Sequence, residues 1–187
     1  TMDRLCKTYN ICLIADEVQS GFSRSGTFFA YQKCSIKPNI ITIAKGMGNG
    51  FPVGGILAHP SIESKYGMLG TTFGGNHLAC SASLAVLDVI KNEGLQEHAK
   101  KMGNYFIDFA QKISSVKKVK GRGLMLGLEF DFPVGPLRKE LIYNQHIFTG
   151  GSSNKNLLRI LPPLTIQKKH FDIFFQKLEE ALKAINV

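Results

Sequence analysis

The sequence predicts an α/β fold. Short β-branched runs occupy the first third, helical periodicity begins near residue 78, and strands and helices alternate from there to the end. Such alternation is typical of α/β proteins. The 187 residues are 44% hydrophobic and 20% charged, fractions of a folded domain rather than of a disordered chain. A chain of this length can bury a real core, so we expect one domain or two small ones.

The first elements are a short helix and a strand. Residues Asp3 to Tyr9 read as the end of a helix, and Asn10 is a plausible stop. Ile11 to Ala15 is a continuous apolar run, which predicts a strand buried on both faces. Asp16 follows this strand directly. The next polar stretch, up to Gly26, is predicted to be a loop.

Two more strands and two glycine-containing segments follow. The β-branched run Ile40 to Ile43 predicts the second strand, and Lys45 comes just after it. Five glycines between residues 46 and 55 surround Pro52, which indicates irregular backbone. Ile56 to Ala58 predicts a third strand, and Gly70 to Asn76 is predicted to be another loop.

Helical spacing dominates the middle of the chain. Apolar residues recur every three or four positions on both sides of Gly94, which predicts two consecutive helices, the second one long. Asn76 is placed to cap the first of them. The apolar positions are Leu84, Leu87, Ile90, Leu95, Met102, Phe106, Phe109 and Ile113.

The last part predicts a smaller α+β region. Val119 to Phe130 resembles one strand interrupted by glycines, Pro136 to Gln145 a helix, and Leu157 to Leu161 a strand closed by two prolines. The C-terminal helix carries an apolar stripe at steps of four and three, which indicates core packing. A break near residue 110 separates the two regions. We therefore expect domains at residues 1–110 and 111–187.

Several functional classes are disfavoured. The longest apolar runs are only a few residues, and the first residues lack the apolar stretch of a secretory signal, so we expect a cytoplasmic protein without membrane contact. The four cysteines never form C-x-x-C, and the five histidines show no metal-binding spacing. We expect no disulfide framework and no metal.

The net charge of +9 raises the question of a nucleic-acid partner. The densest basic stretch runs only from Lys117 to Arg122, and the residues after it read as a strand rather than a recognition helix. We expect a solvated edge and no nucleic-acid binding. A basic balance also suits a protein that holds phosphates and carboxylates.

The candidate chemistry lies at two strand ends. Ligands of parallel α/β sheets bind outside the carboxyl ends of strands, where Asp16 and Lys45 are expected. Each could equally begin an ordinary loop. No phosphate-loop or dinucleotide motif surrounds Lys45, but a lysine amine can form a Schiff base with an aldehyde cofactor. A pyridoxal site also needs an acidic or basic partner for its ring nitrogen, a role that Asp16 could fill.

Four segments together resemble class III pyridoxal-phosphate aminotransferases. Residues 13–26 resemble the D-E-V-Q-x-G-x-x-R-x-G segment, and residues 42–46 resemble the Schiff-base lysine segment. Residues 70–76 are similar to the G-[ST]-T-[FY]-G-G-N loop. Residues 157–164 match the L-R-x-x-P-P-L segment of the acetylornithine and ornithine branch. The resemblance runs almost from end to end, and it implies pyridoxal-phosphate transferase fold type I, with part of the large mixed-sheet domain plus the small C-terminal α+β domain.

The resemblance also implies roles for residues of the first region. Lys45 would bind pyridoxal 5'-phosphate covalently and move the substrate proton. Asp16 would pair with the pyridine nitrogen, because a carboxylate favours the protonated ring. Val18 would pack on one ring face, and Gln19 would form a hydrogen bond near the phenolic oxygen. Without the resemblance, Val18 would read as core and Gln19 as surface.

Two further roles concern the phosphate and the substrate. Thr72, with Thr71, would bind the cofactor phosphate, and in this family that loop reaches the site of the neighbouring subunit, which implies a homodimer. Arg159 would bind a carboxylate of glutamate or 2-oxoglutarate, because a guanidinium suits a bidentate carboxylate. The bland alternative for Arg159 is a surface arginine before a turn. Arg24 reads as structural.

The resemblance finally implies a reaction. It predicts transfer of an amino group from N-acetylornithine or N-succinylornithine to 2-oxoglutarate by a ping-pong mechanism, in arginine biosynthesis. Family chains are about twice as long, so we expect this chain to match the second half of a subunit and to be inactive alone. The alternatives are another class III enzyme, such as an ornithine or 4-aminobutyrate aminotransferase, and a non-catalytic fragment that packs with a partner.

Overall fold

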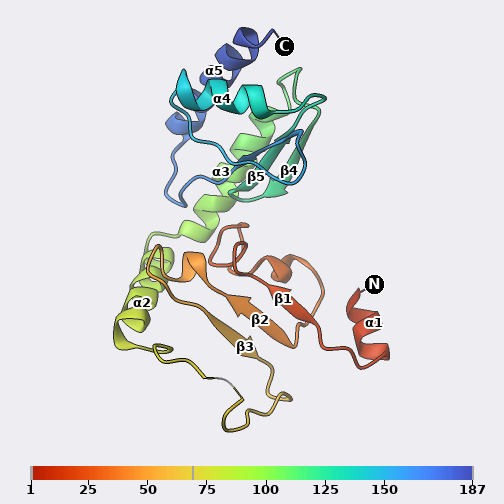
Figure 1. The fold of residues 1–187 in the computed structure, drawn as a ribbon, viewed down its shortest axis with the longest axis vertical. Coiled ribbons are helices and arrows are strands. Elements are labelled where there is room, and N and C mark those ends of the chain that lie inside the picture. Colours follow the sequence, from red (N-terminus) through yellow and green to blue (C-terminus); the bar gives the residue numbers. More distant parts are fainter. Residues whose placement is uncertain (1, 69, 187) are drawn as a thin grey trace. The chain divides into compact units, whose positions relative to one another are not determined.

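The structure is a computed structural model that describes residues 2–68 and 70–186 (Figure 1). It divides into two compact units, residues 1–96 and 97–187. The long helix α3 (Leu95–Ala110) falls almost wholly in the second unit, because its buried face belongs to that unit's core. The domain boundary expected at residue 110 refers to a whole subunit and stays a prediction.

The first unit is built on a mixed three-stranded sheet. Its strands are β1 (Ile14–Asp16), β2 (Ile40–Ile43) and β3 (Gly55–Ala58), in the order β1-β2-β3. β1 and β2 are parallel, and β3 is antiparallel to β2. The remaining elements are α1 (Met2–Thr8), the short 3-10 helices η1 (Ala30–Lys33) and η2 (Lys45–Met47), and α2 (His77–Asn92). The predicted strands and helices of this region are thus confirmed.

One expectation about β1 is wrong for this chain. The strand is shorter than the apolar run, and Ile11 and Ile14 are 56% and 54% exposed rather than buried. Among the named elements of the described chain, β2 is the main neighbour of β1, and Leu13 is buried while Ile11, Cys12 and Ile14 stay exposed. Apolar composition alone therefore indicated the strand but not its burial.

The second unit is an antiparallel sheet covered by helices. The strands β4 (Lys118–Arg122), β5 (Met125–Glu129) and β6 (Leu157–Ile160) lie in the order β4-β5-β6. The helices are α3, α4 (Gly135–Tyr143) and α5 (Lys168–Ala184). The sequence indicated one strand where the structure has the β4–β5 hairpin. Gly123 at the turn has a φ of 54°, which lets the chain reverse there.

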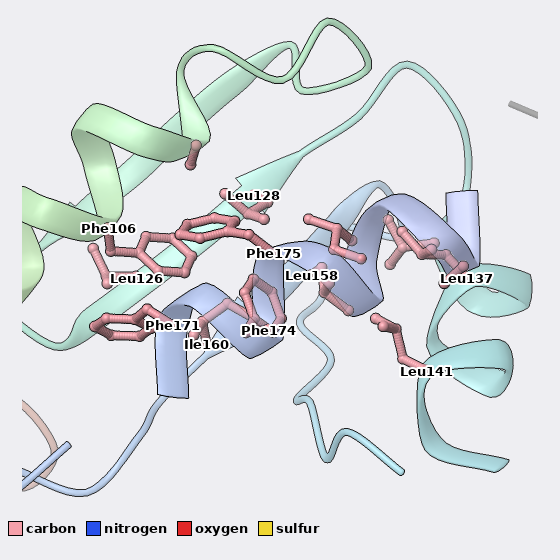
Figure 2. Packing of buried hydrophobic residues seen from close by; sticks show 14 of the residues in the cluster. Phe106, Leu126, Leu128, Leu137, Leu141, Leu158, Ile160, Phe171, Phe174 and Phe175 are labelled. Atoms are coloured by element: carbon pink, nitrogen blue, oxygen red, sulfur yellow. The ribbon is translucent and has the colours of Figure 1, made fainter. Parts of the chain in front are cut away.

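The core of the second unit is aromatic and aliphatic (Figure 2). Phe106 of α3 meets Phe171 and Phe175 of α5, each with ring centroids 5.0 Å apart. Phe174 of α5 is labelled beside them, and the other labelled side chains come from the sheet and α4: Leu126, Leu128, Leu158, Ile160, Leu137 and Leu141. The predicted stripe of the C-terminal helix is confirmed, since all of its members except Ile185 are buried in this core: Phe171, Phe175, Leu178 and Leu182.

Within residues 2–68 and 70–186 no helix is long and apolar enough to cross a membrane. The same residues hold no cluster of three metal-ligating side chains, and all four cysteines are free. The basic stretch begins just before β4 and continues along it. Lys120 pairs with Glu129 at 2.9 Å, and Lys117 pairs with Asp131. These ion pairs agree with the solvated edge that the sequence predicts.

Candidate active site

Two chemically important residues lie at the carboxyl ends of adjacent parallel strands. In the register of β1 and β2, Asp16 lies opposite Thr42, three residues before Lys45. A parallel pair of strands needs a long crossover connection, which residues 17–39 provide here. Asp16 therefore ends β1, and Lys45 comes two residues after the end of β2, at the carboxyl ends of neighbouring strands where α/β sheets bind ligands.

The carboxylate of Asp16 is held on one side only. Its Oδ1 accepts a hydrogen bond from the Thr42 hydroxyl at 3.0 Å and another from the Val18 backbone N–H at 3.1 Å. No residue that the structure describes donates to Oδ2. The two bonds fix the carboxylate plane and leave one oxygen for an outside donor. Thr42 was missed from the sequence, because only the strand register brings it to Asp16.

Lys45 begins the 3-10 helix η2 in an uncommon conformation. Its φ is 47°, in the left-handed region that non-glycine residues seldom adopt. The turn closes through a hydrogen bond from the Gly48 N–H to the Lys45 carbonyl at 3.1 Å. The side chain is exposed, and its Nζ has no partner among the described residues. Backbone strain of this kind clusters at functional sites, where the surrounding structure maintains it.

A glycine behind Lys45 fixes the local path of the chain. A Cβ on Gly48 would lie 2.4 Å from the carbonyl oxygen of Phe51, far inside van der Waals contact. Only glycine allows the turn after Lys45 to pack this closely against the following segment. At least this glycine of the cluster has a structural reason that involves no ligand.

The residues after Asp16 form a tightly tied turn. Val18 and Gln19 are half-buried in it, and their predicted contacts with a cofactor stay predictions. Glu17, to which the sequence assigned no role, is 2% exposed. Its carboxylate accepts hydrogen bonds from the Ser20 hydroxyl at 2.6 Å and from the N–H groups of residues 30 and 31 at 3.0 and 2.8 Å. A buried carboxylate with three donors anchors the loop that carries Val18 and Gln19.

Arg24 belongs to the same loop region. Burial lowers the pKa of its guanidinium from the ordinary value, because a charged group is less well solvated there. The group nevertheless stays protonated, as arginines in proteins do. Its burial supports the structural reading that the sequence favoured.

The segment with Thr71 and Thr72 lies before helix α2. Both threonines are exposed in a loop, and their binding of a phosphate stays a prediction. The predicted cap is confirmed: the Asn76 side chain accepts a hydrogen bond from the Ala79 N–H at 2.9 Å. The side chain also donates to the Phe73 carbonyl at 2.8 Å, which fixes the loop's last turn.

Arg159 lies in the second unit, on β6. It is opposite Gly127 of β5 on one side and forms an isolated bridge with Gly150 on the other. Its Nε is buried without a hydrogen-bond partner in the described part of the chain. A Cβ on Gly150 would lie 2.9 Å from this Nε, so the guanidinium rests directly on the glycine. The sequence did not point to Gly150, since pairing across the sheet is invisible in local spacing.

A comparison with known families decides the relationship of the chain. The family described as "Aminotransferase class-III" matches residues 1–182 of the chain. The chain belongs to the class III aminotransferase family. This confirms the resemblance that the four motifs indicate. Members of this family depend on pyridoxal phosphate, which confirms the predicted cofactor of the family.

Individual relatives agree with this assignment. The chain is 43% identical to the acetylornithine aminotransferase of Aquifex aeolicus, over 97% of this chain and 47% of the relative. It also resembles the solved acetylornithine aminotransferase of Elizabethkingia anophelis, with a TM-score of 0.86 and 31% identity over 97% of this chain and 48% of that one. The predicted fold class is therefore confirmed. The chain spans about half the length of these relatives.

A second solved relative bears on the cofactor. The ornithine aminotransferase of Toxoplasma gondii, with pyridoxal phosphate at partial occupancy in its active site, has a TM-score of 0.87 and 27% identity. The match covers 98% of this chain and 45% of that one. Its strong likeness to this chain shows that the backbone alone does not separate acetylornithine from ornithine enzymes.

Proposed function

We propose that this chain is the lysine-bearing half of an aminotransferase that moves an amino group from N-acetylornithine or N-succinylornithine to 2-oxoglutarate. The products would be a semialdehyde and glutamate, as a step of arginine biosynthesis in the cytoplasm. The observation that carries the proposal is the placement of Asp16 and Lys45 at the carboxyl ends of neighbouring parallel strands. The likeness to acetylornithine aminotransferases supports the choice of amino donor.

The residues of the first unit fit pyridoxal phosphate. Asp16 offers an unshared Oδ2 to the ring N–H, while Thr42 and the Val18 N–H hold its other oxygen. Lys45 offers an amine without an ion-pair partner in the described chain. When bound, the cofactor supplies an electron sink for the electron pair that remains on the amino-bearing carbon after its proton is removed. The Nζ of Lys45 takes that proton and returns it.

Two further binding roles are proposed, one in the second unit and one in the exposed loop. Arg159 binds one carboxylate of 2-oxoglutarate or glutamate through its guanidinium, whose Nε is unpartnered among the described residues. Thr71 and Thr72 bind the cofactor phosphate of the neighbouring subunit in a homodimer. Their exposure leaves both hydroxyls available for such a contact.

The chain alone is proposed to be inactive, because half of the relatives' length has no counterpart in it. The first experiment mixes the purified chain with pyridoxal phosphate, reduces with borohydride and measures glutamate formation. We expect no turnover. Modification of Lys45 together with turnover would contradict the proposed inactivity.

The second experiment tests the reaction. The chain is produced together with the half of the Aquifex aeolicus relative that it does not match, and glutamate is assayed with three donors. We expect N-acetylornithine to be used faster than ornithine or 4-aminobutyrate. The substitution Lys45→Ala should abolish activity, whereas Lys65→Ala, at another exposed lysine, should not. Faster use of ornithine would favour the alternative that the Toxoplasma gondii relative represents.

A further inference from the structure

A second arginine, Arg138 on α4, lies against the segment that pairs with Arg159. Its Nε donates a hydrogen bond to the Thr149 carbonyl at 3.0 Å. Its Nη1 lies 3.5 Å from the place that a Cβ on Gly151 would occupy. The guanidinium of Arg138 therefore follows the short segment from Thr149 to Gly151.

The same segment determines where Arg159 can lie. Gly150 and Arg159 exchange two backbone hydrogen bonds, each 2.9 Å long. The Nε and Nη2 of Arg159 lie 2.9 and 3.4 Å from the place of a Cβ on Gly150. A shift of this segment by a few tenths of an ångström would change the surface on which the guanidinium of Arg159 rests.

Arg138 connects the segment to a rigid support. Its neighbours on α4, Leu137 and Leu141, are fully buried in the core of the second unit. The Thr149 hydroxyl is buried but forms no hydrogen bond within the described chain. Among the described residues, Arg138 is thus the one side chain that ties residues 149–151 by a hydrogen bond.

We propose that Arg138 is a positioning residue for Arg159. It holds the Thr149 to Gly151 segment in place and so keeps the Arg159 guanidinium aimed at a substrate carboxylate. This inference rests on the proposed role of Arg159. Precise support of a binding group reduces the ordering that binding must otherwise impose, so loss of Arg138 should weaken carboxylate binding.

The first test needs no ligand. The 187-residue chain is labelled with ¹⁵N, and the Nε–H resonance of Arg159 is followed by NMR. We expect Arg138→Gln to shift this resonance and to speed its exchange with solvent, and Arg138→Lys to restore it in part. Lys139→Gln removes a charge from the next, exposed position of α4 and should change neither quantity. Gly150→Ala displaces Arg159 directly and serves as the positive control.

The second test adds 2-oxoglutarate to the same samples. We expect its dissociation constant at Arg159 to rise about threefold to tenfold in Arg138→Gln, as for a lost hydrogen bond to a charged group. Equal affinity in the unmodified chain and in Arg138→Gln would overturn the inference while leaving the proposed function intact. If 2-oxoglutarate shifts no resonance of Arg159 in any sample, the proposed role of Arg159 fails, and the ligand-free test still decides the positioning.

The NMR signals of core residues distinguish a positioning role of Arg138 from a merely structural one. The methyl resonances of Leu137 and Leu141 report whether α4 stays packed. An unchanged Arg159 resonance in Arg138→Gln would overturn the inference. So would a loss of the core resonances in Arg138→Gln that Arg138→Lys does not restore.

Discussion

At the scale of single residues, the two oxygens of the Asp16 carboxylate differ in their hydrogen bonds. Oδ1 of Asp16 is committed to Thr42 and to the Val18 N–H, and its Oδ2 is left over. A carboxylate oxygen held by two donors keeps the group in one orientation. Thr42 thus belongs to the candidate site through Asp16, although it bears no chemistry of its own.

Replacing Thr42 by valine tests whether the Thr42 hydroxyl supports Asp16 in this way. Thr42→Val keeps the β-branched shape and removes the hydroxyl that donates to Asp16 Oδ1. We expect the dissociation constant of pyridoxal phosphate to rise about threefold to tenfold in the enzyme completed with its missing half. Cofactor titration measures it. Thr165→Val, at an exposed threonine whose side chain has no hydrogen-bond partner among the described residues, is the control. An equal rise in both variants would remove Thr42 from the site.

At the scale of elements, helix α3 packs against the β4–β5 turn through two glycines. A Cβ on Gly103 would lie 2.2 Å from the Gly123 carbonyl oxygen, which is backbone and has little freedom to move away. Such contact lets the helix and the hairpin approach without a side chain between them.

The substitution Gly103→Ala sets two effects against each other. Helix propensity favours alanine by about 1 kcal/mol, whereas the clash should cost roughly 1–3 kcal/mol. We expect a net loss in the free energy of unfolding, measured with urea. Gly135→Ala, at the start of α4 where nothing lies within 4 Å, should be neutral or stabilising. A more stable Gly103→Ala variant would show that the hairpin moves aside.

Helices α3 and α5 are also joined by a polar contact with a pH dependence. The Tyr105 hydroxyl donates to the carboxylate of Asp172, and Lys168 lies 5.3 Å from the Tyr105 ring centroid. The hydrogen bond to Asp172 raises the pKa of Tyr105 above its ordinary value, and desolvation and the charge of Asp172 add to the effect. The contact needs the protonated phenol, so its contribution is complete below the ordinary pKa of tyrosine. It is lost as the pH rises through the raised pKa.

Ultraviolet titration of the phenols checks this contact. We expect Tyr105 to ionise above the ordinary pKa of tyrosine, and Asp172→Asn to bring its pKa down toward that value. The substitution Tyr105→Phe should remove the late transition, and Tyr143→Phe should leave it. A late transition that survives Tyr105→Phe would assign it to another tyrosine.

At the scale of the whole molecule, the two units differ in how completely they are covered. The second unit encloses the aromatic and aliphatic core that Figure 2 shows. The first unit instead exposes apolar side chains on β3 and α2, with Ile56, Leu57 and Leu84 at 49%, 47% and 62%. Exposed apolar surface of this extent marks a place for a partner.

The apolar dye ANS tests this difference. We expect the chain alone to enhance ANS fluorescence, and production together with the unmatched half of the Aquifex aeolicus relative to reduce it, because that polypeptide would cover the first unit. An unrelated folded protein added in equal amount is the control. Unchanged fluorescence in the completed protein would contradict this placement of the exposed surface.

The sequence by itself determined the order and type of most elements, the family and the positions of Asp16, Lys45 and Arg159. Local periodicity, turn residues and four motifs carry this information along the chain. Only the tertiary structure brought Thr42 to Asp16 and Gly150 to Arg159. It also placed Arg138 against the segment beside Arg159, and it buried Glu17 among three hydrogen-bond donors. It also resolved the β4–β5 hairpin and the exposure of β1. These features depend on strand register and on which surfaces are covered, and both arise from contacts between residues far apart in the sequence.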